Sequence, residues 1–528
     1  MKNQNNYADI ILESNAIFTS KIGEDEPFSG IVVIKDNKII AVDQKQNITK
    51  WIGSKTKIYK LENKLICPGF VDNHVFFTGY VWSKAGVDLS NVHNSEEALL
   101  AIEEYAKNIP NSKTILGHCL NMNNWHEVEK GSAVLDKVFK DRPVIAFSKD
   151  RSECWLNTIA NQKYGIEHDK CYAEACFKLF QELLKEENIV DEYNNFSKLL
   201  ASRGVTSIKE IGFDDYYGFT DILEQMELKG ELIHRINLVS QPVSNNANFE
   251  YGDTCSKRFQ NSFIKFMGYN LMVDGEIASH EGELLKPYKD IPDSCGKYSP
   301  DYKTLEETAQ AADKKGFRCA LHAEGDAAVR KSIDIIERCR LINGKRDSRH
   351  AIIDLELVHP DDIVRMSNLG ITAINYVQIM NCTSKYSDFY AQDLIGDDRI
   401  NNYWPYKRMI DKGVNICCGT DLPLDIPNIP LSVYFVTSRR FPDGNPLTGF
   451  NKKQSMSKAD ILRAWTIGGQ YANFSDDKLG TIEEGKLADI TVLDNNIFDL
   501  SVDEIKDVKV CLTITDGKIV YNTLNKGK

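Results

Sequence analysis

The sequence predicts a parallel α/β barrel of the (β/α)8 TIM type, beside a small β-sandwich domain that both chain ends form together. Short apolar runs rich in β-branched residues alternate with amphipathic stretches through the middle of the chain, and strand-and-turn patterns occupy both ends. Repeated strand and helix units over this length are typical of such a barrel. An open doubly wound sheet is the alternative, but no Gly-x-Gly-x-x-Gly or P-loop pattern follows any of the apolar runs.

Both ends of the chain have the pattern of short antiparallel strands. Residues 485–494 alternate apolar and polar side chains, and an Asp516-Gly517 turn separates two further runs of this kind. Four runs near the N-terminus have the same character: 8–12, 30–34, 38–42 and 56–61. Two strand-rich ends most simply form one domain. We therefore expect residues 1–66 and 476–528 to make a composite β-sandwich domain, and residues 67–475 to make the barrel with its insertions.

The middle of the chain contains apolar runs with the length and composition of buried parallel strands. They are residues 114–117, 143–147, 205–209, 235–239, 319–322, 352–357, 372–376 and 415–421. Amphipathic stretches such as 328–339, which carries apolar residues on one helical face, fill the gaps between them. We therefore expect strands and helices to alternate around the barrel.

The charge balance argues against two classes of partner. The chain of 528 residues carries 64 Lys and Arg against 76 Asp and Glu, a formal net charge of −12, which disfavours nucleic acid or an anionic membrane. No apolar run reaches the roughly 18 residues that span a bilayer, and the N-terminus lacks the apolar segment of a secretion signal. The 13 cysteines are scattered, which favours reduced thiols. We expect a cytoplasmic protein whose partner is a small-molecule substrate.

Polar side chains close three of the apolar runs, at the end of the strand where barrel enzymes place their active sites. Asp72 and His74 close the first run, His322 closes a middle run and Asp421 closes the last. A single histidine at a strand end is usually an ordinary hydrogen-bonded residue. Three such ends together indicate a catalytic or metal site at one mouth of the barrel.

Longer motifs extend these strand ends over nearly the whole chain. They are Pro68-Gly-Phe-Val-Asp-Asn-His74, Asp150 with Trp155-Leu-Asn157, Asp274-Gly275 with residues 284–288, and residues 322–329, 357–363, 419–423 and 479–489. In this combination the chain resembles the amidohydrolase superfamily, and specifically amidohydrolase family 3, the branch that includes N-substituted formamide deformylases. The resemblance implies a barrel that carries a metal site, beside a β-sandwich built from both chain ends.

The chain departs from this family's usual metal site at several positions. That site contains a His-x-His pair, a lysine that can be carboxylated to bridge two metals, two later histidines and an aspartate. Here Phe76 stands in place of the second histidine, Asn270 in place of the lysine and Asp354 in place of one later histidine. Lys265 could serve as the bridging lysine only through a local shift. These losses argue against a two-metal centre.

A single divalent metal ion is still compatible with the remaining ligands. His74, His322, Asp354 and Asp421 would supply two imidazoles and two carboxylates, a set that suits zinc or iron(II). The resemblance assigns to Asp421 the transfer of a proton from water to the leaving nitrogen. We expect His322 and Asp354 to be its catalytic neighbours.

Further residues are expected to line the substrate pocket: Phe76, Asp150, Trp155, Asn270 and Glu324. Glu324 stands where the family usually has an aliphatic residue, and it supplies either a base near the centre or a salt bridge with a strand-end cation such as Lys209. His359 precedes Pro-Asp-Asp and is expected to begin a helix.

Three functions stay open on these residues. The first is hydrolysis of amide-like, non-peptide C–N bonds in a small molecule, with at most one metal ion. The second is a metal-independent lyase, isomerase or hydratase, because the same titratable groups in a cleft can transfer protons without a metal. The third is a non-catalytic protein that binds a small molecule on the same scaffold. The sequence does not identify the substrate, and a homodimer is left open.

Overall fold

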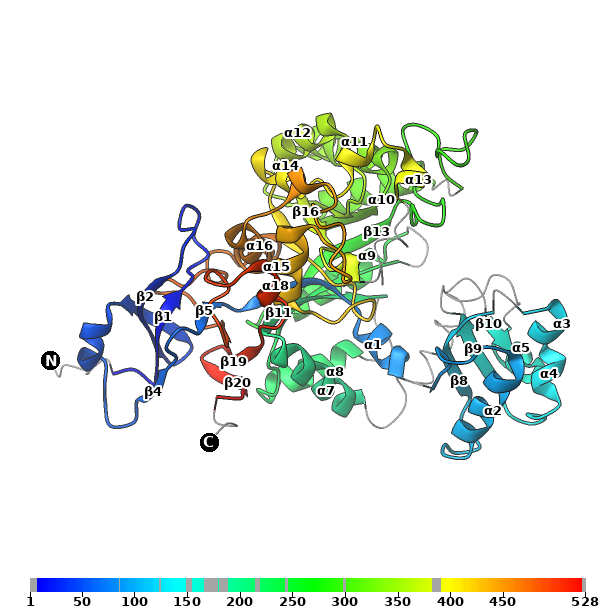
Figure 1. Cartoon of the computed structure of the whole chain (residues 1–528), viewed down its shortest axis with the longest axis horizontal. Coiled ribbons are helices and arrows are strands. Elements are labelled where there is room, and N and C mark those ends of the chain that lie inside the picture. Colours follow the sequence, from blue (N-terminus) through cyan, green and yellow to red (C-terminus); the bar gives the residue numbers. More distant parts are fainter. Residues whose placement is uncertain are drawn as a thin grey trace. The chain divides into compact units, whose positions relative to one another are not determined.

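The chain divides into two compact units. The computed structural model describes residues 7–84, 86–122, 125–148, 154–165, 179, 189–213, 219–242, 246–297, 301–381 and 391–524. The first unit comprises Met1–Phe76, Asn194–Asp215 and Thr220–Lys528, and the second comprises Phe77–Tyr193 and Tyr216–Phe219. The first unit contains the barrel and a sheet formed by both chain ends (Figure 1).

An eight-stranded parallel sheet forms the barrel of the first unit, in the order β17-β16-β15-β14-β13-β12-β11-β6. Its strands are β6 (Phe70–Val75), β11 (Val205–Gly212), β12 (Arg235–Ser240), β13 (Ile264–Met272), β14 (Arg318–Ala323), β15 (Ala351–Asp354), β16 (Thr372–Asn375) and β17 (Ile416–Cys418). A parallel bridge between Val75 and Leu422 brings the last strand back to the first, and the Phe76 amide donates to the Leu422 carbonyl at 2.8 Å. The barrel prediction is confirmed.

Helices alternate with the barrel strands along the chain. They are α7 (Ile189–Ser202), α8 (Phe219–Leu228), α9 (Phe249–Arg258), α10 (Tyr302–Lys314), α11 (Asp326–Asn343), α12 (Pro360–Leu369), α13 (Ala391–Ile395), α14 (Tyr406–Asp411), α15 (Ile429–Ser438), α16 (Lys458–Trp465) and α17 (Ile467–Ala472). Short 3-10 turns are η1 (Lys45–Lys50), η2 (Ile379–Asn381), η4 (Ile400–Asn402) and η5 (Lys452–Gln454). In the described part of the chain, no helix is both long and apolar enough to cross a membrane.

The ends of α12 show how local sequence sets the helix bounds. His359 is the N-cap, and its ring accepts a hydrogen bond from the Asp361 amide at 3.3 Å. Pro360 occupies the first turn, where a missing N–H costs nothing. Gly370 ends the helix in the left-handed region, with φ 70°. The prediction that His359 begins a helix is confirmed.

Both ends of the chain join in a second eight-stranded sheet. Its strands are β1 (Ile10–Ile17), β2 (Phe28–Lys35), β3 (Lys38–Asp43), β4 (Lys57–Lys60), β5 (Leu65–Pro68), β18 (Ile490–Leu493), β19 (Val510–Thr515) and β20 (Lys518–Asn522). Helix α18 (Val502–Ile505) lies between β18 and β19 in the chain. Antiparallel pairing of β5 with β18 connects the N-terminal and C-terminal strands. That this sheet forms a sandwich domain bounded at residues 66 and 476 stays a prediction.

Residues that the sequence placed in the barrel form a separate four-stranded sheet in the second unit. Its order is β10-β9-β8-β7. Its elements are β7 (Val87–Asp88), β8 (Ile115–Leu120), β9 (Val144–Ser148), β10 (Cys154–Leu156), α1 (Phe77–Lys84), α2 (Ser95–Ala106), α3 (Glu127–Lys130), α4 (Ser132–Asp136) and α5 (Thr158–Tyr164). The expectation that runs 114–117 and 143–147 are barrel strands was therefore wrong. Strands with helices between them have the same pattern in either sheet, so the pattern alone does not say which sheet a strand joins.

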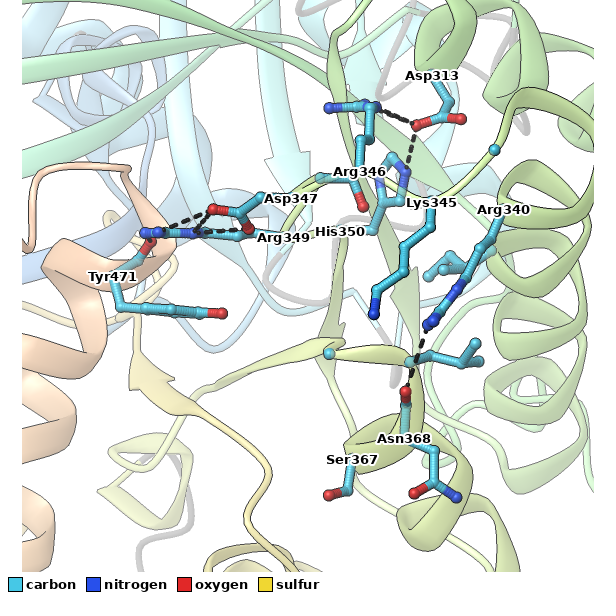
Figure 2. A pocket seen from close by; sticks show the side chains of 15 residues that line it. Asp313, Arg340, Lys345, Arg346, Asp347, Arg349, His350, Ser367, Asn368 and Tyr471 are labelled. Atoms are coloured by element: carbon cyan, nitrogen blue, oxygen red, sulfur yellow. Dashed lines mark hydrogen bonds and ion pairs between the residues drawn. The ribbon is translucent and has the colours of Figure 1, made fainter.

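A buried carboxylate, Asp313 on α10, holds the segment that leads into β15 (Figure 2). It accepts hydrogen bonds from Arg346 Nε and Asn343 Nδ2, both at 2.8 Å. His350 Nδ1 accepts from the Cys319 amide, so its Nε2 carries the proton that points at Asp313, 3.0 Å away. Burial raises the pKa of Asp313, but the bonds from His350 and Asn343 outweigh it and lower the pKa to about 2.

We expect Asp313→Asn to lower the free energy of unfolding by about 2 kcal/mol at neutral pH. Because the folded pKa lies below the usual value of 3.8, the ionised carboxylate stabilises the fold above about pH 4, and this stabilisation is lost as the pH falls towards 2. Urea unfolding at about pH 7 and about pH 2.5 measures the difference between wild type and variant. The same difference at both values would contradict this assignment.

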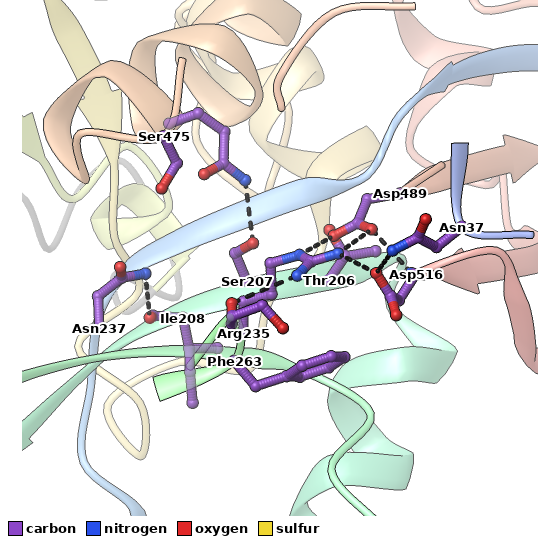
Figure 3. A network of polar contacts seen from close by, with 12 residues as sticks. Asn37, Thr206, Ser207, Ile208, Arg235, Asn237, Phe263, Ser475, Asp489 and Asp516 are labelled. Atoms are coloured by element: carbon purple, nitrogen blue, oxygen red, sulfur yellow. Dashed lines mark hydrogen bonds and ion pairs between the residues drawn. The ribbon is translucent and has the colours of Figure 1, made fainter. Parts of the chain in front are cut away.

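A second buried charge network joins the barrel to the sheet of the chain ends (Figure 3). Arg235 at the start of β12 donates to Asp489 through Nε at 2.8 Å and through a terminal nitrogen at 3.0 Å, and to Asp516 at 2.9 Å. The side chains of Arg235 and Asp489 are only 6% and 3% exposed. In a buried pair of this kind, the attraction between the opposite charges offsets the cost of removing them from water.

Candidate active site

Most of the residues that the sequence singled out lie at or near the carboxyl ends of barrel strands. His74 is near the end of β6, Asn270 near the end of β13 and His322 near the end of β14. Asp354 ends β15, and Asp421 follows β17 by three residues. Since the carboxyl ends of parallel strands meet at one mouth of a barrel, these side chains share the face where barrel enzymes act.

The side chains of His322, Glu324 and Asp354 have the spacing of metal ligands. Ligand atoms of His322, Glu324 and Asp354 all lie within 4.8 Å of one another. His322 Nε2 is 3.5 Å from Asp354 Oδ2. The Nδ1 atom of His322 is buried and has no hydrogen-bond partner among the described residues. One imidazole and two carboxylates are a donor set that zinc or iron(II) accepts, so the side chains present fit a single metal ion.

Further carboxylates surround this cluster. Asp274 accepts hydrogen bonds from the amides of Glu324 at 2.9 Å, Gly325 at 3.0 Å and Glu283 at 2.8 Å. Glu356 accepts from the Tyr403 hydroxyl and from Trp404 Nε1. Asp274 therefore fixes the backbone at Glu324, while Glu356 is tied to the segment around residue 403.

The pKa values of the buried carboxyl groups of Glu324, Glu356 and Asp274 are raised. Burial, together with the charge of Asp354, raises the pKa of Glu324 well above its usual value and that of Glu356 to about 8. Burial also raises the pKa of Asp274 to about 7, against the three amide bonds that it accepts. Burial lowers the pKa of His322, but the contact with Asp354 and the surrounding negative charge outweigh it and raise the pKa overall.

His74 and Asp421 form a second pair. His74 Nε2 lies 3.5 Å from Asp421 Oδ1. Burial and the positive charges of Lys209 and His322 lower the pKa of His74 well below its usual value, so the imidazole is neutral at pH 7. The contact is therefore one between a neutral ring and a carboxyl group rather than a pair of full charges.

Asp72 fixes the backbone beside His74 and Asp421 through hydrogen bonds. It accepts hydrogen bonds from the Thr420 hydroxyl at 2.6 Å, the Thr420 amide at 3.1 Å and the His74 amide at 3.2 Å. Burial raises the pKa of Asp72 to about 7, and these bonds oppose the rise. Asp72 thus joins the two strand ends that carry His74 and Asp421.

Tyr376, which the sequence did not single out, contacts both imidazoles. Its ring centroid lies 5.2 Å from that of His74 and 6.3 Å from that of His322. The hydroxyl is buried and has no hydrogen-bond partner among the described residues. Its place at the end of an apolar run was the available signal, but a tyrosine there is usually a core residue.

The backbone is strained at both acidic strand ends. Asp354 and Leu355 have φ of 77° and 62°, and Asp421 has φ of 53°. Residues other than glycine rarely adopt these conformations outside turns, and they cluster at functional sites, where surrounding structure holds a side chain in a required direction.

The side chains of Phe76 and Asn270 do not fit the family's second metal position. Phe76 packs edge-on against His74, with ring centroids 5.2 Å apart, and stacks on Phe213 at 6.0 Å. It also lies against the buried cluster of Ile211, Val239 and Met267. Asn270 is fully buried, and its amide nitrogen donates to Gln241 at 2.6 Å. Hydrocarbon and an amide thus occupy the space where a two-metal centre needs ligands.

The metal site that the sequence predicted stays a prediction, and the side chains with metal-ligand spacing are a different set. It was to be formed by His74, His322, Asp354 and Asp421, but among described residues the group with metal-ligand spacing takes Glu324 and leaves out His74 and Asp421. His74 instead faces Asp421, and the Tyr376 ring contacts both imidazoles.

Neither Lys209 nor Lys265 has the role that the sequence left open for it. The predicted salt bridge between Glu324 and Lys209 is absent among the described contacts: Glu324 accepts from the Ile277 amide at 2.9 Å, and the Lys209 ammonium is buried without a hydrogen-bond partner there. Lys265, near the start of β13, donates to Ser475 at 2.8 Å. It is therefore at the opposite end of its strand from Asn270 and does not replace the bridging lysine.

Two further residues that were expected to line the substrate pocket, Asp150 and Trp155, fall within the residue range of the second unit. Trp155 on β10 is fully buried there and packs edge-on against Trp125, with centroids 5.2 Å apart. This position gives the expected substrate contact no support. Asp150 lies outside the described residues.

The sequence as a whole matches one family model. The model described as "Amidohydrolase family" matches residues 57–521. This chain belongs to the amidohydrolase family. The barrel and the strand-end site lie within the matched residues, whereas β1, β2 and β3 of the terminal sheet precede them.

Two distant relatives of this amidohydrolase match over nearly their full length. It is 24% identical to the protein LONG AFTER FAR-RED 3 of Arabidopsis thaliana, over 97% of this chain and 92% of the relative. It is 21% identical to an N-substituted formamide deformylase of Arthrobacter pascens, over 93% and 94%. An uncharacterized metal-dependent hydrolase from Pyrococcus horikoshii has the same fold, with a TM-score of 0.77 at 20% identity over 94% of this chain and 99% of that chain.

Proposed function

We propose that this amidohydrolase hydrolyses a non-peptide C–N bond of an amide-like small molecule, with one divalent metal ion held by His322, Glu324 and Asp354. The observation that carries the proposal is the spacing of these three side chains, whose ligand atoms lie within 4.8 Å of one another at the mouth of the barrel. The crowded carboxylates around them favour a bound cation, because like charges in a buried site repel. The formamide deformylase among the relatives supports the choice of bond.

The metal-binding group and the pair of His74 and Asp421 have separate roles in this reaction. A bound metal ion supplies Lewis acidity and lowers the pKa of water. Asp421 accepts a proton from the attacking water and returns it to the leaving nitrogen, as a general base and then a general acid. His74, which is neutral, faces the Asp421 carboxyl group at 3.5 Å and orients it. Asp72 holds both residues in register through Thr420 and the His74 amide.

The apolar side chains around Phe76 indicate which class of substrate to expect. Phe76 packs against His74 and stacks on Phe213, and Ile211 and Val239 lie against Phe76. Apolar side chains at this position favour a substrate with an apolar group next to the scissile bond, because burying that group releases water from both surfaces. We therefore infer that the substrate is an amide or formamide with an apolar N-substituent.

Turnover on a small panel tests the proposal. N-benzylformamide, N-butylformamide and unsubstituted formamide are supplied to protein purified without chelator, and formate release is measured. We expect release from the substituted compounds, loss of release after chelation, and recovery on adding zinc or iron(II). Turnover that survives exhaustive chelation would reject the metal-dependent mechanism.

A metal-independent proton-transfer enzyme is the second candidate, and the pair of His74 and Asp421 favours it. These two groups face each other at 3.5 Å, outside the group with metal-ligand spacing. A neutral imidazole beside a carboxyl group can move a proton in a lyase or isomerase without a metal. Chelator-resistant turnover that Asp421→Asn abolishes would favour this candidate over hydrolysis.

A further inference from the structure

A positively charged cavity lies at the end of the barrel opposite to the strand-end site. Its volume is about 360 Å³. It is lined by the end of α11, by residues 344–350 before β15, by residues 367–370 before β16, and by Tyr471 at the end of α17. Since β15 runs from Ala351 to Asp354, the cavity is at the amino end of the same strand whose carboxyl end carries Asp354.

Four basic side chains line this cavity, and two of them are already paired. Arg346 donates to Asp313 at 2.8 Å. Arg349 contacts Asp347 and donates to Asp476 at 2.6 Å. These pairs account for the acidic residues of the lining, Asp313 and Asp347.

The other two cations, Arg340 and Lys345, have no acidic partner among the described residues. The described hydrogen bond of Arg340 goes to the Asn368 carbonyl at 3.4 Å, which is long. No described acceptor bonds to the Lys345 ammonium. Figure 2 shows both side chains extending side by side into the space above Ser367 and Asn368. Two unpaired positive groups side by side repel, so an anion between them would lower the free energy of both.

The size and chemistry of the cavity indicate the class of anion. An arginine fork matches the oxygens of phosphate or carboxylate, and a lysine adds a mobile point charge. The volume exceeds that of a bare inorganic ion and suits a small organic molecule. Elsewhere in the lining, the Arg349 guanidinium stacks on the Tyr471 ring, 4.0 Å from its centroid.

We propose that this cavity binds a small organic dianion, a phosphate monoester or a dicarboxylate, between Arg340 and Lys345. The anionic group bonds to these two side chains, and the organic part lies towards Tyr471. The site is separate from His322, Glu324 and Asp354, so the proposal stands whether or not the chain hydrolyses C–N bonds.

Isothermal titration calorimetry with phenyl phosphate and with succinate tests the proposal at low salt, with phenol as the uncharged control. We expect wild-type protein to bind at least one dianion with a Kd of about 1 mM or below, and phenol not to bind. Binding should weaken as salt is raised, because the cations are near the surface. Binding of phenyl phosphate alone would identify a phosphate monoester as the ligand class, and binding of both would identify a general dianion site.

Charge-matched variants decide whether binding takes place in this cavity. The double variant Arg340→Gln with Lys345→Gln is expected to weaken binding at least about tenfold. Its control, Arg338→Gln with Lys331→Gln, removes the same charge from exposed positions of α11 outside the lining and should leave the Kd unchanged. A phosphate group bound by a metal ion at the other end of the barrel would survive in both variants. Absence of binding to wild type at about 10 mM, or an equal Kd in both double variants, would overturn the proposal.

Discussion

Asp421→Asn is expected to lower turnover by about 10²- to 10⁴-fold, the usual contribution of a positioned general acid and base. Asparagine has the same shape but cannot accept a proton from water or return it to the leaving nitrogen. The position is held by Asp72 through Thr420 and by a backbone with φ of 53°, so the amide should occupy the same place. Steady-state kinetics on the best substrate of the panel measures the effect, which should fall on kcat rather than KM.

Two controls separate this loss from a general disturbance. Asp411→Asn makes the same chemical change on the exposed face of α14 and should leave turnover unchanged. Metal content of Asp421→Asn should equal that of wild type, because Asp421 lies outside the group with metal-ligand spacing. Loss of metal in this variant would show instead that Asp421 is a ligand, as the sequence alone suggested.

Arg235→Met is expected to lower the free energy of unfolding by about 3 to 5 kcal/mol, because it leaves a buried carboxylate without its cation. Asp489 is 3% exposed and receives two of the bonds from Arg235, while Asp516 receives the third. The loss falls on the connection between β12 and the sheet of the chain ends. Chemical unfolding monitored by circular dichroism measures it.

The double variant Arg235→Met with Asp489→Asn is the internal control. Removing the carboxylate together with its partner avoids an uncompensated charge, so the double variant should be more stable than Arg235→Met alone. A double variant as unstable as the sum of the two single variants would contradict a direct interaction and point to lost packing around Phe263, whose ring lies 4.9 Å from the Arg235 guanidinium.

The barrel and its strand-end residues could be predicted because each depends on a local pattern. Apolar runs that end in His74, His322 and Asp421 show both the strand and the end at which chemistry occurs, whereas Asp354 was chosen from the family resemblance. The replacement of the usual ligands by Phe76 and Asn270 is likewise visible residue by residue. The joining of both chain ends followed from their shared antiparallel pattern.

The grouping of Glu324 with His322 and Asp354 could not be predicted, because it depends on distances across the barrel. Glu324 follows His322 by two residues, which places both on one side of a strand, but its approach to Asp354 depends on how β14 and β15 pair. The role of Asp274 in fixing the Glu324 amide is also a contact across strands. The separate sheet of β8 and β9 was missed because the strands of both sheets have the same pattern.

Metal content of wild type and Glu324→Gln tests the central claim most directly. Glutamine can still accept the hydrogen bond from the Ile277 amide, so the fold should persist, but its neutral amide is a poor ligand for zinc or iron(II). Glu307→Gln, an exposed change on α10, is the matched control. Mass spectrometry of protein purified without chelator should find about one equivalent of metal in wild type and Glu307→Gln, and a clear loss in Glu324→Gln. Less than about a tenth of an equivalent in wild type, or full occupancy in Glu324→Gln, would contradict a metal site formed by His322, Glu324 and Asp354.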